Sequence, residues 1–219
     1  MLSPKEHFSY SQYTLFKSSP KWYFLKYFCN KGYSGGYEYG KKVANSLEKG
    51  ESPTAELKLL NTFIKKYPEM GYHIEVDFEG IKIVAEFDGF DKDLLHLGEY
   101  KTGEYKKSCI WTQARADKHI QITWYFFLVY IMTGKLLNKT VLHYIPVERI
   151  RDSQGKVISE SILFDKIREF ETKRSLADIA RLSVDIKKVW KQIDKMGEDL
   201  LLNGFVEIKG KRYYKEELN

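Results

Sequence analysis

Apolar and polar residues alternate along the stretch 72–87, and this period of two is typical of β-strands with one buried face. Glu79 and Gly80 interrupt the alternation at its centre, which predicts the tight turn of a hairpin. Two further stretches, 140–146 and 157–164, predict strands that are separated by a polar turn. The pattern therefore predicts a sheet that carries part of the core.

Apolar residues recur every three to four positions in other stretches, and this spacing predicts helices. The stretch 8–30 predicts two short helices, the first capped by Ser9 and the second beginning at Pro20 behind the cap Ser19. A third helix is predicted at 41–49, where a glycine closes it. The first part of the chain is therefore expected to be helical.

Three features follow between the predicted strands. The stretch 32–40 is rich in glycine and tyrosine and predicts a loop. The stretch 54–67 predicts an amphipathic helix that ends before a proline. Within 111–133, the core sequence HIQITWYFFLVYIMTG is apolar on nearly all sides, so we expect a helix that is buried against the sheet.

The last third of the chain predicts a long charged helical part at 165–202 and a small hairpin at 204–214, turning at Lys209 and Gly210. No stretch has the Pro, Ser and Gly composition of a linker, and no internal repeat is visible. We therefore expect one domain over 1–219.

The composition is that of a folded protein with a moderate positive charge. Of 219 residues, 43% are hydrophobic, and the formal net charge is +6, which favours a polyanionic partner without requiring one. No apolar run is long enough to span a bilayer, and the N-terminus lacks a signal pattern. We therefore expect a cytoplasmic protein with no membrane partner. Its two cysteines are too few for the four thiolates of a usual iron–sulfur site.

Candidate chemistry gathers in the stretch 84–102, which predicts a strand, a turn at 91–93 and a second strand. Asp88 ends the first strand, and Glu99 and Lys101 lie two positions apart on the second. Side chains two apart on a strand share a face, so two carboxylates and an ammonium group would meet there. Hard divalent cations prefer such oxygen ligands. The alternative from these residues alone is a solvated hairpin with no chemistry.

Two other features leave alternatives open. The aromatic residues of 8–30 lie at helical spacing and alternate with lysines, which is typical of an amphipathic core face but also of a platform that stacks nucleic-acid bases. The basic residues of 165–202 form either a solvated face or a set of phosphate contacts; they are Arg168, Lys173, Arg174, Arg181, Lys187 and Lys188.

The spacing D-x10-E-x-K-T-G, here Asp88, Glu99 and Lys101, resembles the core of the PD-(D/E)XK nuclease superfamily. The Q-x-x-x-Y pattern of Gln121 and Tyr125 on the apolar helix resembles the RecB-like and phage-exonuclease branch of that superfamily. In that branch the glutamine and tyrosine lie beside the active site and help to hold the substrate or a water molecule. Together with the next two matches, the resemblance covers about residues 9–134.

Two N-terminal motifs are similar to the same branch. The S-x-S-x-x-x-x-F and S-P-x-x-x-F patterns match its opening helices, but Ser19 stands where iron–sulfur members carry a cluster cysteine, so no iron–sulfur cluster is expected. The helix G-x-x-x-A-x-x-L-E matches a G-x-x-x-H-x-x-L-E motif, with Ala44 at the position of the metal-site histidine. Glu48 lies one turn further along the same face and is a candidate replacement ligand.

The resemblance implies an α/β (α+β) fold, with a restriction-endonuclease-like mixed central sheet flanked by helices. It implies Mg²⁺ or Mn²⁺ as cofactor, held by Asp88, Glu99 and the carbonyl of Tyr100, with Glu48 as a further candidate. Lys101 would position the attacking water. The implied function is a metal-dependent deoxyribonuclease that binds single-stranded DNA or duplex ends, with possible protein partners in recombination or repair.

Several alternatives stay open. The departure at Ala44 makes a metal- and nucleic-acid-binding module of the same fold, which no longer cleaves, the main alternative to the enzyme. The second alternative is an interaction protein in which the D-x10-E-x-K spacing is accidental. An exonuclease is favoured over an endonuclease and DNA over RNA, but neither choice follows from the sequence, nor do strand polarity and oligomeric state.

Overall fold

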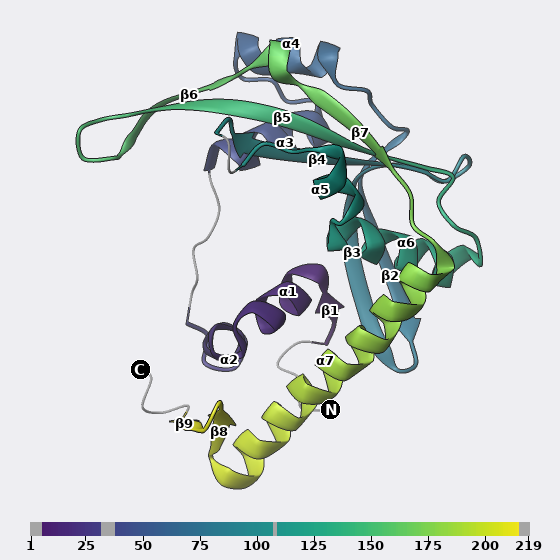
Figure 1. The fold of residues 1–219 in the computed structure, drawn as a ribbon, viewed down its shortest axis with the longest axis vertical. Helices are drawn as coiled ribbons and strands as arrows, with labels where there is room; N and C mark the ends of the chain where they lie inside the picture. Colours follow the sequence, from purple (N-terminus) through teal and green to yellow (C-terminus); the bar gives the residue numbers. More distant parts are fainter. Residues whose placement is uncertain (1–5, 32–37, 107–108, 215–219) are drawn as a thin grey trace. The chain divides into compact units, whose positions relative to one another are not determined.

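The computed structural model describes residues 6–31, 38–106 and 109–214 (Figure 1), so most of the predicted loop 32–40 lies outside the described residues. The described residues group into two compact units. Unit 1 is drawn from Met1–Gly35, Glu75–Ala85 and Ser175–Asn219, and unit 2 from Gly36–Ile74 and Glu86–Arg174. Each unit is therefore built from segments that are far apart in the sequence, and one domain over 1–219 stays a prediction.

Two strands run from one unit into the other. They are β2 (Glu69–Phe78) and β3 (Ile81–Asp91), which form the predicted hairpin. Glu79 and Gly80 both have positive φ, 53° and 79°, as expected for a two-residue turn that matches the twist of its strands. The backbone N–H of Gly80 is further held by the Asp77 side chain at 3.0 Å.

Unit 1 begins with the strand β1 (Phe8–Ser9), which pairs in parallel with β3. The helices α1 (Tyr10–Ser18) and α2 (Pro20–Tyr27) follow, and their caps, Ser9 and Ser19, accept the predicted N-terminal hydrogen bonds. The core-facing interpretation of this stretch holds for the aromatic residues that are buried, which are Phe8, Tyr13, Phe16, Tyr23 and Phe24, whereas Trp22 is exposed.

The long helix α7 (Leu176–Asn203) also belongs to unit 1 and begins with a capping box. Ser175 receives the backbone N–H of Asp178, and the Asp178 side chain accepts from the Ser175 backbone. The helix ends at Gly204, and the terminal hairpin of β8 (Phe205–Ile208) and β9 (Lys211–Tyr214) follows. The prediction of a terminal hairpin is confirmed.

Unit 2 contains the rest of the sheet. The end of β3 pairs antiparallel with β4 (His96–Glu104), and β4 pairs in parallel with the long β5 (Lys139–Arg151). The other edge of β5 carries β7 (Arg168–Thr172) along its first half and β6 (Val157–Ile162) along its second, both antiparallel. The sheet is therefore mixed, as predicted.

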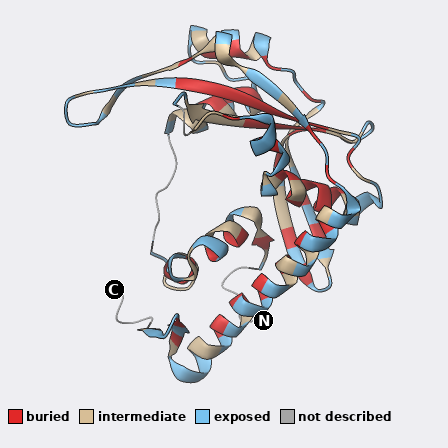
Figure 2. Ribbon diagram, in the orientation of Figure 1, coloured by how far each residue is buried: buried red, intermediate tan, exposed pale blue. Residues whose placement is uncertain are grey.

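Helices of unit 2 cover both faces of this part of the sheet (Figures 1 and 2). Apolar residues of α3 (Glu38–Lys49) and α4 (Ala55–Phe63) pack with Tyr100 and Ile145 on one face. On the other face, α5 (Gln113–Asp117) packs against the alternate residues of β5. The predicted apolar helix α6 (Ile120–Thr133) is buried along most of its length. The mixed α/β fold is confirmed.

The structure corrects several predicted boundaries, including the start of the helix predicted at 41–49, which begins at Glu38. The helix predicted at 54–67 ends at Phe63, because Ile64 is extended and buried while Phe63 is 55% exposed. The stretch 111–133 forms two helices, α5 and α6, since Lys118 and His119 leave the helix between them.

The helical part predicted at 165–202 begins only at Leu176. The short 3₁₀ helix η1 (Phe164–Lys166) and the strand β7 precede it. Residues 168–172 form a strand because they pair with an edge of β5. The spacing of apolar residues along the chain gives no information about this partner, which is distant in sequence. No helix among the described residues has an apolar stretch of the length that crossing a bilayer requires.

Arg174 is buried in unit 2 rather than solvated, which removes it from the predicted phosphate contacts. Its guanidinium donates hydrogen bonds to the hydroxyls of Thr123 and Thr172, at 2.8 and 2.6 Å. It also donates to the carbonyls of Ala116 and His119 at the break between α5 and α6. Each of these carbonyls also accepts a backbone N–H, that of Ala116 from His119 and that of His119 from Ile122. The guanidinium therefore adds a second donor to each and connects the break between α5 and α6 to Thr172 at the end of β7.

We expect Arg174→Met to lower the free energy of unfolding by about 3 kcal/mol, because several buried acceptors lose a charged donor. Urea unfolding measures this change. Lys173→Met, at the neighbouring exposed position, is the matched control and should change stability by less than about 0.5 kcal/mol. Equal effects of the two substitutions would show that the buried guanidinium contributes nothing specific.

Candidate active site

The antiparallel pair of β3 and β4 brings Asp88 and Glu99 together. Gly89 and Gly98 are paired across the two strands, and Asp88 and Glu99 are their neighbours on the same side of that pair. The strand β3 continues three residues beyond Asp88, to Asp91, so Asp88 lies inside the strand rather than at its end. The register therefore brings the two carboxylate-bearing residues to adjacent strands, each next to the glycine pair at the end of the ladder.

A direct hydrogen bond fixes Asp88 on β4. Its Oδ2 accepts from the backbone N–H of Tyr100 at 2.7 Å. A hydrogen bond from a backbone amide to a carboxylate is charge-assisted and directional. The Asp88 side chain is thereby held beside the residue that follows Glu99.

Glu99 and Lys101 form an ion pair on one face of β4, as their spacing predicts. The Glu99 side chain is only 1% exposed, and its Oε1 pairs with Lys101 Nζ. The hydroxyl of Tyr125 is a further hydrogen-bonding partner of this carboxylate. The Lys101 side chain is 25% exposed, so the ammonium group connects a buried carboxylate with the solvent-accessible side of the site.

The predicted pair on α6 completes a chain of contacts with Lys101. Lys101 Nζ donates to Gln121 Oε1 at 2.8 Å, and Gln121 Nε2 donates to the hydroxyl of Tyr125. The Tyr125 hydroxyl donates in turn to the carbonyl of Glu86 at 3.3 Å. The structure therefore brings Gln121 and Tyr125 to the same place as the β4 residues, and it ties α6 to both strands.

The electrostatics of the cluster are dominated by crowded negative charge. Burial raises the pKa of the Asp88 carboxyl well above its usual range, and the nearby Glu99 raises it further. The Lys101 ammonium and the Tyr100 N–H oppose this rise in the pKa of Asp88 but do not cancel it. Burial and the two carboxylates also raise the pKa of Tyr125, so its hydroxyl stays protonated and acts as a donor.

Glu48, the candidate replacement ligand, lies near the cluster on α3. Its charge contributes to the raised pKa of Asp88, and its own pKa is raised by burial and by Glu86. Among the described residues, however, no group of three His, Cys, Asp or Glu side chains is arranged to hold a metal ion. Metal ligation by Glu48 and by the Tyr100 carbonyl therefore stays a prediction.

The donor set fits a hard divalent cation at two of the predicted ligands. Asp88 and Glu99 are oxygen donors on paired strands, and the Glu99 carboxylate is buried with the Lys101 ammonium as its ion-pair partner. A cation would compensate the excess negative charge, and Mg²⁺ binds through one or two carboxylates while it keeps several waters. The residues present therefore fit Mg²⁺ or Mn²⁺.

Comparison with known proteins gives information at the level of fold. No protein-family model matches the chain, and no curated protein sequence does. A crystal structure from Eubacterium rectale, of a protein named "putative exonuclease", matches with a TM-score of 0.51 and 12% identity over 87% of this chain and 82% of that one. The two chains share a fold. At this level of identity the match describes the nuclease-like architecture and not the activity.

Sequence reasoning missed the residues that surround the cluster. Tyr67 is buried, and its ring lies against both Gly89 and Gly98. The Tyr67 hydroxyl is 3.4 Å from Nε2 of the buried His143 on β5. The two strand glycines were the available signal, because a glycine inside a strand often marks a close approach by another group.

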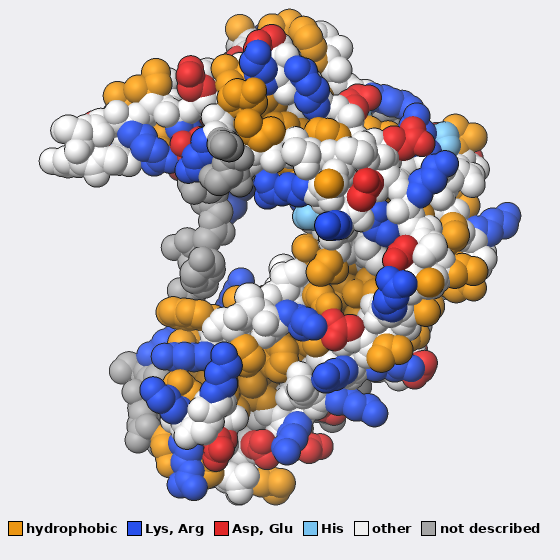
Figure 3. Space-filling view, viewed as in Figure 1, with side chains coloured by type: hydrophobic (Ala, Val, Ile, Leu, Met, Phe, Trp, Pro, Cys, Tyr) orange, Lys and Arg blue, Asp and Glu red, His pale blue; other side chains and the backbone are white. Residues whose placement is uncertain are grey.

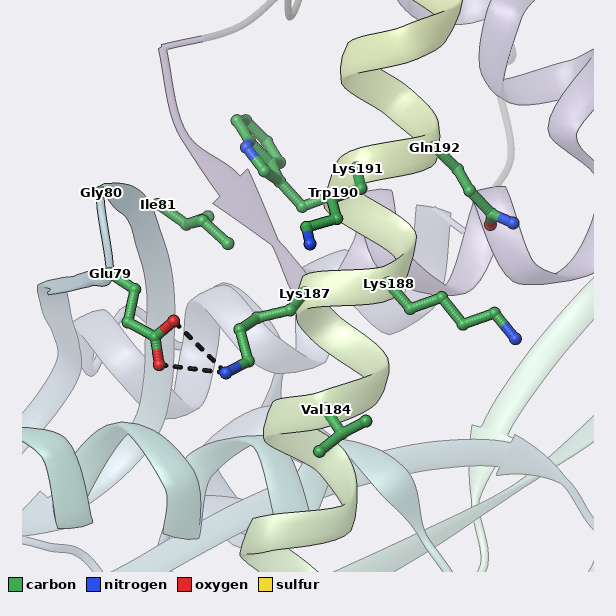
Figure 4. Close-up of a pocket in the computed structure, with 9 residues that line it drawn as sticks. All are labelled: Glu79, Gly80, Ile81, Val184, Lys187, Lys188, Trp190, Lys191 and Gln192. Carbon is green, nitrogen blue, oxygen red and sulfur yellow. Dashed lines mark hydrogen bonds and ion pairs between the residues drawn. The ribbon is translucent and has the colours of Figure 1, made fainter.

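A second candidate feature is a cavity of about 750 Å³ within unit 1, between the β2–β3 turn and α7 (Figure 4). Ile81 and Trp190 contribute apolar lining, and Lys187, Lys188 and Lys191 contribute charge. Lys187 points toward the turn, where it pairs with Glu79 at 3.1 Å, whereas Lys188 points away from it.

Lysine and arginine side chains recur over the face of unit 1 that is drawn in Figure 3. Two of the lysines predicted to contact phosphate, Lys187 and Lys188, have different surroundings. Lys187 is already neutralised by Glu79, whereas Lys188 is exposed.

We expect Asp88→Asn to change how stability depends on pH. A carboxyl with a raised pKa binds its proton more tightly in the folded chain. In the wild type it therefore lowers the free energy of unfolding as pH rises from the ordinary aspartate pKa of 3.8 through the raised value. The variant lacks this loss, so its stability relative to the wild type should grow as pH rises. Urea unfolding with EDTA present, from about pH 4 to about pH 8, measures the difference.

Asp93→Asn, in the exposed turn before β4, controls for the loss of one negative charge. A relative stability of Asp88→Asn that rises with pH no more steeply than that of the control would contradict the raised pKa.

Proposed function

We propose that this protein is a metal-dependent nuclease that hydrolyses phosphodiester bonds of DNA, acting as an exonuclease. The observation that carries the proposal is the cluster of two adjacent carboxylates and an ammonium group, in which Lys101 contacts both Glu99 and Gln121. The nuclease-like fold supports the same class of reaction. The finer assignments, to DNA, to strand ends and to particular residues, belong to the proposal.

Asp88 and Glu99 would hold Mg²⁺ or Mn²⁺. A bound divalent cation would supply positive charge against the phosphate and would favour ionisation of water at neutral pH. Because burial raises the pKa of Asp88, cation binding has to compete with a proton there, and it becomes easier as pH rises. The two carboxylates contribute this binding and take no covalent part in the reaction.

Lys101 would orient the attacking water and stabilise the negative charge that develops on the phosphate. The water gives up a proton to the surrounding solvent as its oxygen bonds to phosphorus, the P–O ester bond breaks, and the departing alkoxide takes up a proton from solvent. Gln121 and Tyr125 would keep the ammonium aimed at this place, since their hydrogen bonds connect it to the Glu86 carbonyl. A fixed donor of this kind requires little reorganisation during the reaction.

DNA is the proposed substrate because the chain carries many basic side chains that can contact phosphate groups. The net charge of +6 and the exposed lysines of α7 provide them. None of the described elements is recognised as a base-reading motif such as a helix-turn-helix. Binding is therefore proposed to follow the phosphate backbone with no preferred sequence.

We expect Lys101→Gln to lower DNA cleavage in Mg²⁺ or Mn²⁺ by at least about 100-fold, because a neutral amide cannot replace the ammonium in proton transfer or charge stabilisation. Glutamine keeps hydrogen-bonding capacity beside the buried Glu99, which limits the loss of stability. Fluorescence-labelled DNA on denaturing gels measures the rate, and circular dichroism checks the fold.

Lys92→Gln is the matched control, since Lys92 lies in the exposed turn between the same two strands. It should cleave at the wild-type rate. Cleavage by Lys101→Gln at the wild-type rate would remove Lys101 from the mechanism. If the folded wild type binds Mn²⁺ and DNA but cleaves neither single-stranded nor duplex DNA, the non-cleaving module replaces the nuclease as the function.

The preferred substrate should be DNA with free ends. Linear duplex and single-stranded DNA should be degraded, and closed circular DNA should persist under the same conditions. Binding should weaken with salt by about 0.7 log units per phosphate contact on single strands for each tenfold rise in concentration. Cutting of closed circles at one discrete sequence would instead identify a site-specific endonuclease.

A further inference from the structure

Each candidate ligand has a glycine as its neighbour on the side of the turn between β3 and β4. Gly89 follows Asp88 on β3, Gly98 precedes Glu99 on β4, and the two glycines pair directly. Glycine is the most flexible residue in a strand and contributes no packing of its own. The distance between the Asp88 and Glu99 carboxylates therefore depends on the side chains of other residues that pack against the two glycines.

Tyr67 is the group that covers the pair. A β-carbon on Gly89 would come within 2.5 Å of a ring carbon of Tyr67, and one on Gly98 would come closer still. A strand with any side chain at either position would collide with the ring. The glycines and the ring therefore fit one another as a unit within unit 2.

The ring is itself held from both sides. Tyr67 is 6% exposed, and its hydroxyl lies 3.4 Å from His143 Nε2. His143 is fully buried, and its Nδ1 lies 3.0 Å from the Glu169 carboxylate on β7. The contacts run from the glycine pair through Tyr67 and β5 to the edge strand, so the ring has little freedom to move.

We propose that Tyr67 is a positioning residue, whose ring fixes the Gly89–Gly98 pair and thereby the separation of Asp88 and Glu99 as ligands of a divalent cation. The inference rests on the proposed function for its metal site, but it concerns the support of that site and not the cleavage step.

Mn²⁺ binding, measured by isothermal titration calorimetry, tests the proposal without DNA. Tyr67→Leu removes the flat ring and should weaken Mn²⁺ binding by about 10- to 100-fold, the range typical of groups that support metal ligands. Tyr67→Phe keeps the ring and loses only the contact with His143, so it should bind Mn²⁺ with nearly wild-type affinity.

Leu60→Ala is the control for a general loss of core packing. Leu60 is fully buried in the same core cluster as Tyr67, but the atoms nearest to the glycine pair belong to Tyr67 and not to Leu60. Its melting temperature should fall at least as far as that of Tyr67→Leu, while its affinity for Mn²⁺ stays at the wild-type value. Equal loss of Mn²⁺ affinity in Leu60→Ala and Tyr67→Leu would overturn the proposal.

Gly98→Ala tests the contact between Tyr67 and the glycine pair by changing the glycine instead of the ring. Its methyl group should displace the ring and weaken Mn²⁺ binding, and combining it with Tyr67→Leu should weaken binding by less than the product of the two single effects. Multiplicative effects would show that the two positions act independently and would count against the proposal.

The outcomes separate this proposal from the proposed function. Mn²⁺ binding that depends on Tyr67 in a protein that does not cleave DNA would support the positioning role and refute the nuclease. Cleavage and Mn²⁺ binding that are both unaffected by Tyr67→Leu would refute the positioning role alone. A wild-type protein that binds no Mn²⁺ would overturn both.

Discussion

The buried Glu99 carboxylate sets the constraint on which the arrangement of unit 2 depends. Removing a carboxylate from water costs several kcal/mol unless charge or hydrogen bonds compensate. Here the compensating charge is the Lys101 ammonium, which also lies near Asp88, and the hydroxyl of Tyr125 adds a hydrogen bond to Glu99. Because the positive charge is too small for the negative charge around it, the site is suited to accept a cation rather than to be complete without one.

The neighbouring helix is shaped by the same constraint. An apolar helix such as α6 buries polar side chains only where they find partners, since an unpaired buried amide costs about 1–3 kcal/mol. Gln121 and Tyr125 satisfy this condition by bonding to Lys101, to each other and to the Glu86 carbonyl. Their hydrogen bonds limit the positions that the ammonium can take and so make one geometry of the cluster more stable than others.

Local pattern was sufficient for much of the fold and for the centre of the site. The alternation of apolar and polar residues predicted the β2–β3 hairpin, and the serine caps predicted where α1 and α2 begin. The two-residue spacing of Glu99 and Lys101 predicted that their side chains share a face of the strand. The residues that were missed depend on partners distant in sequence. β7 is a strand because it pairs with the edge of β5. Arg174 is buried where its guanidinium donates to the carbonyls of Ala116 and His119, which are distant from it in sequence. A short stretch of sequence around β7 or Arg174 does not contain these partners, so a local pattern cannot predict the contacts.

The interleaving of the two units has a consequence for how the chain is made. Ribosomes release a protein from its N-terminus onward, and domains generally fold as they emerge. Unit 2 has all its segments once Arg174 has been synthesised, whereas unit 1 still lacks α7. Phe8 and Tyr13 of unit 1 are buried in the finished structure, and the Phe8 ring lies 5.3 Å from that of Trp190 on α7. During translation these aromatic side chains are therefore made long before the helix that covers them, and partly synthesised chains at this stage expose apolar surface that favours aggregation.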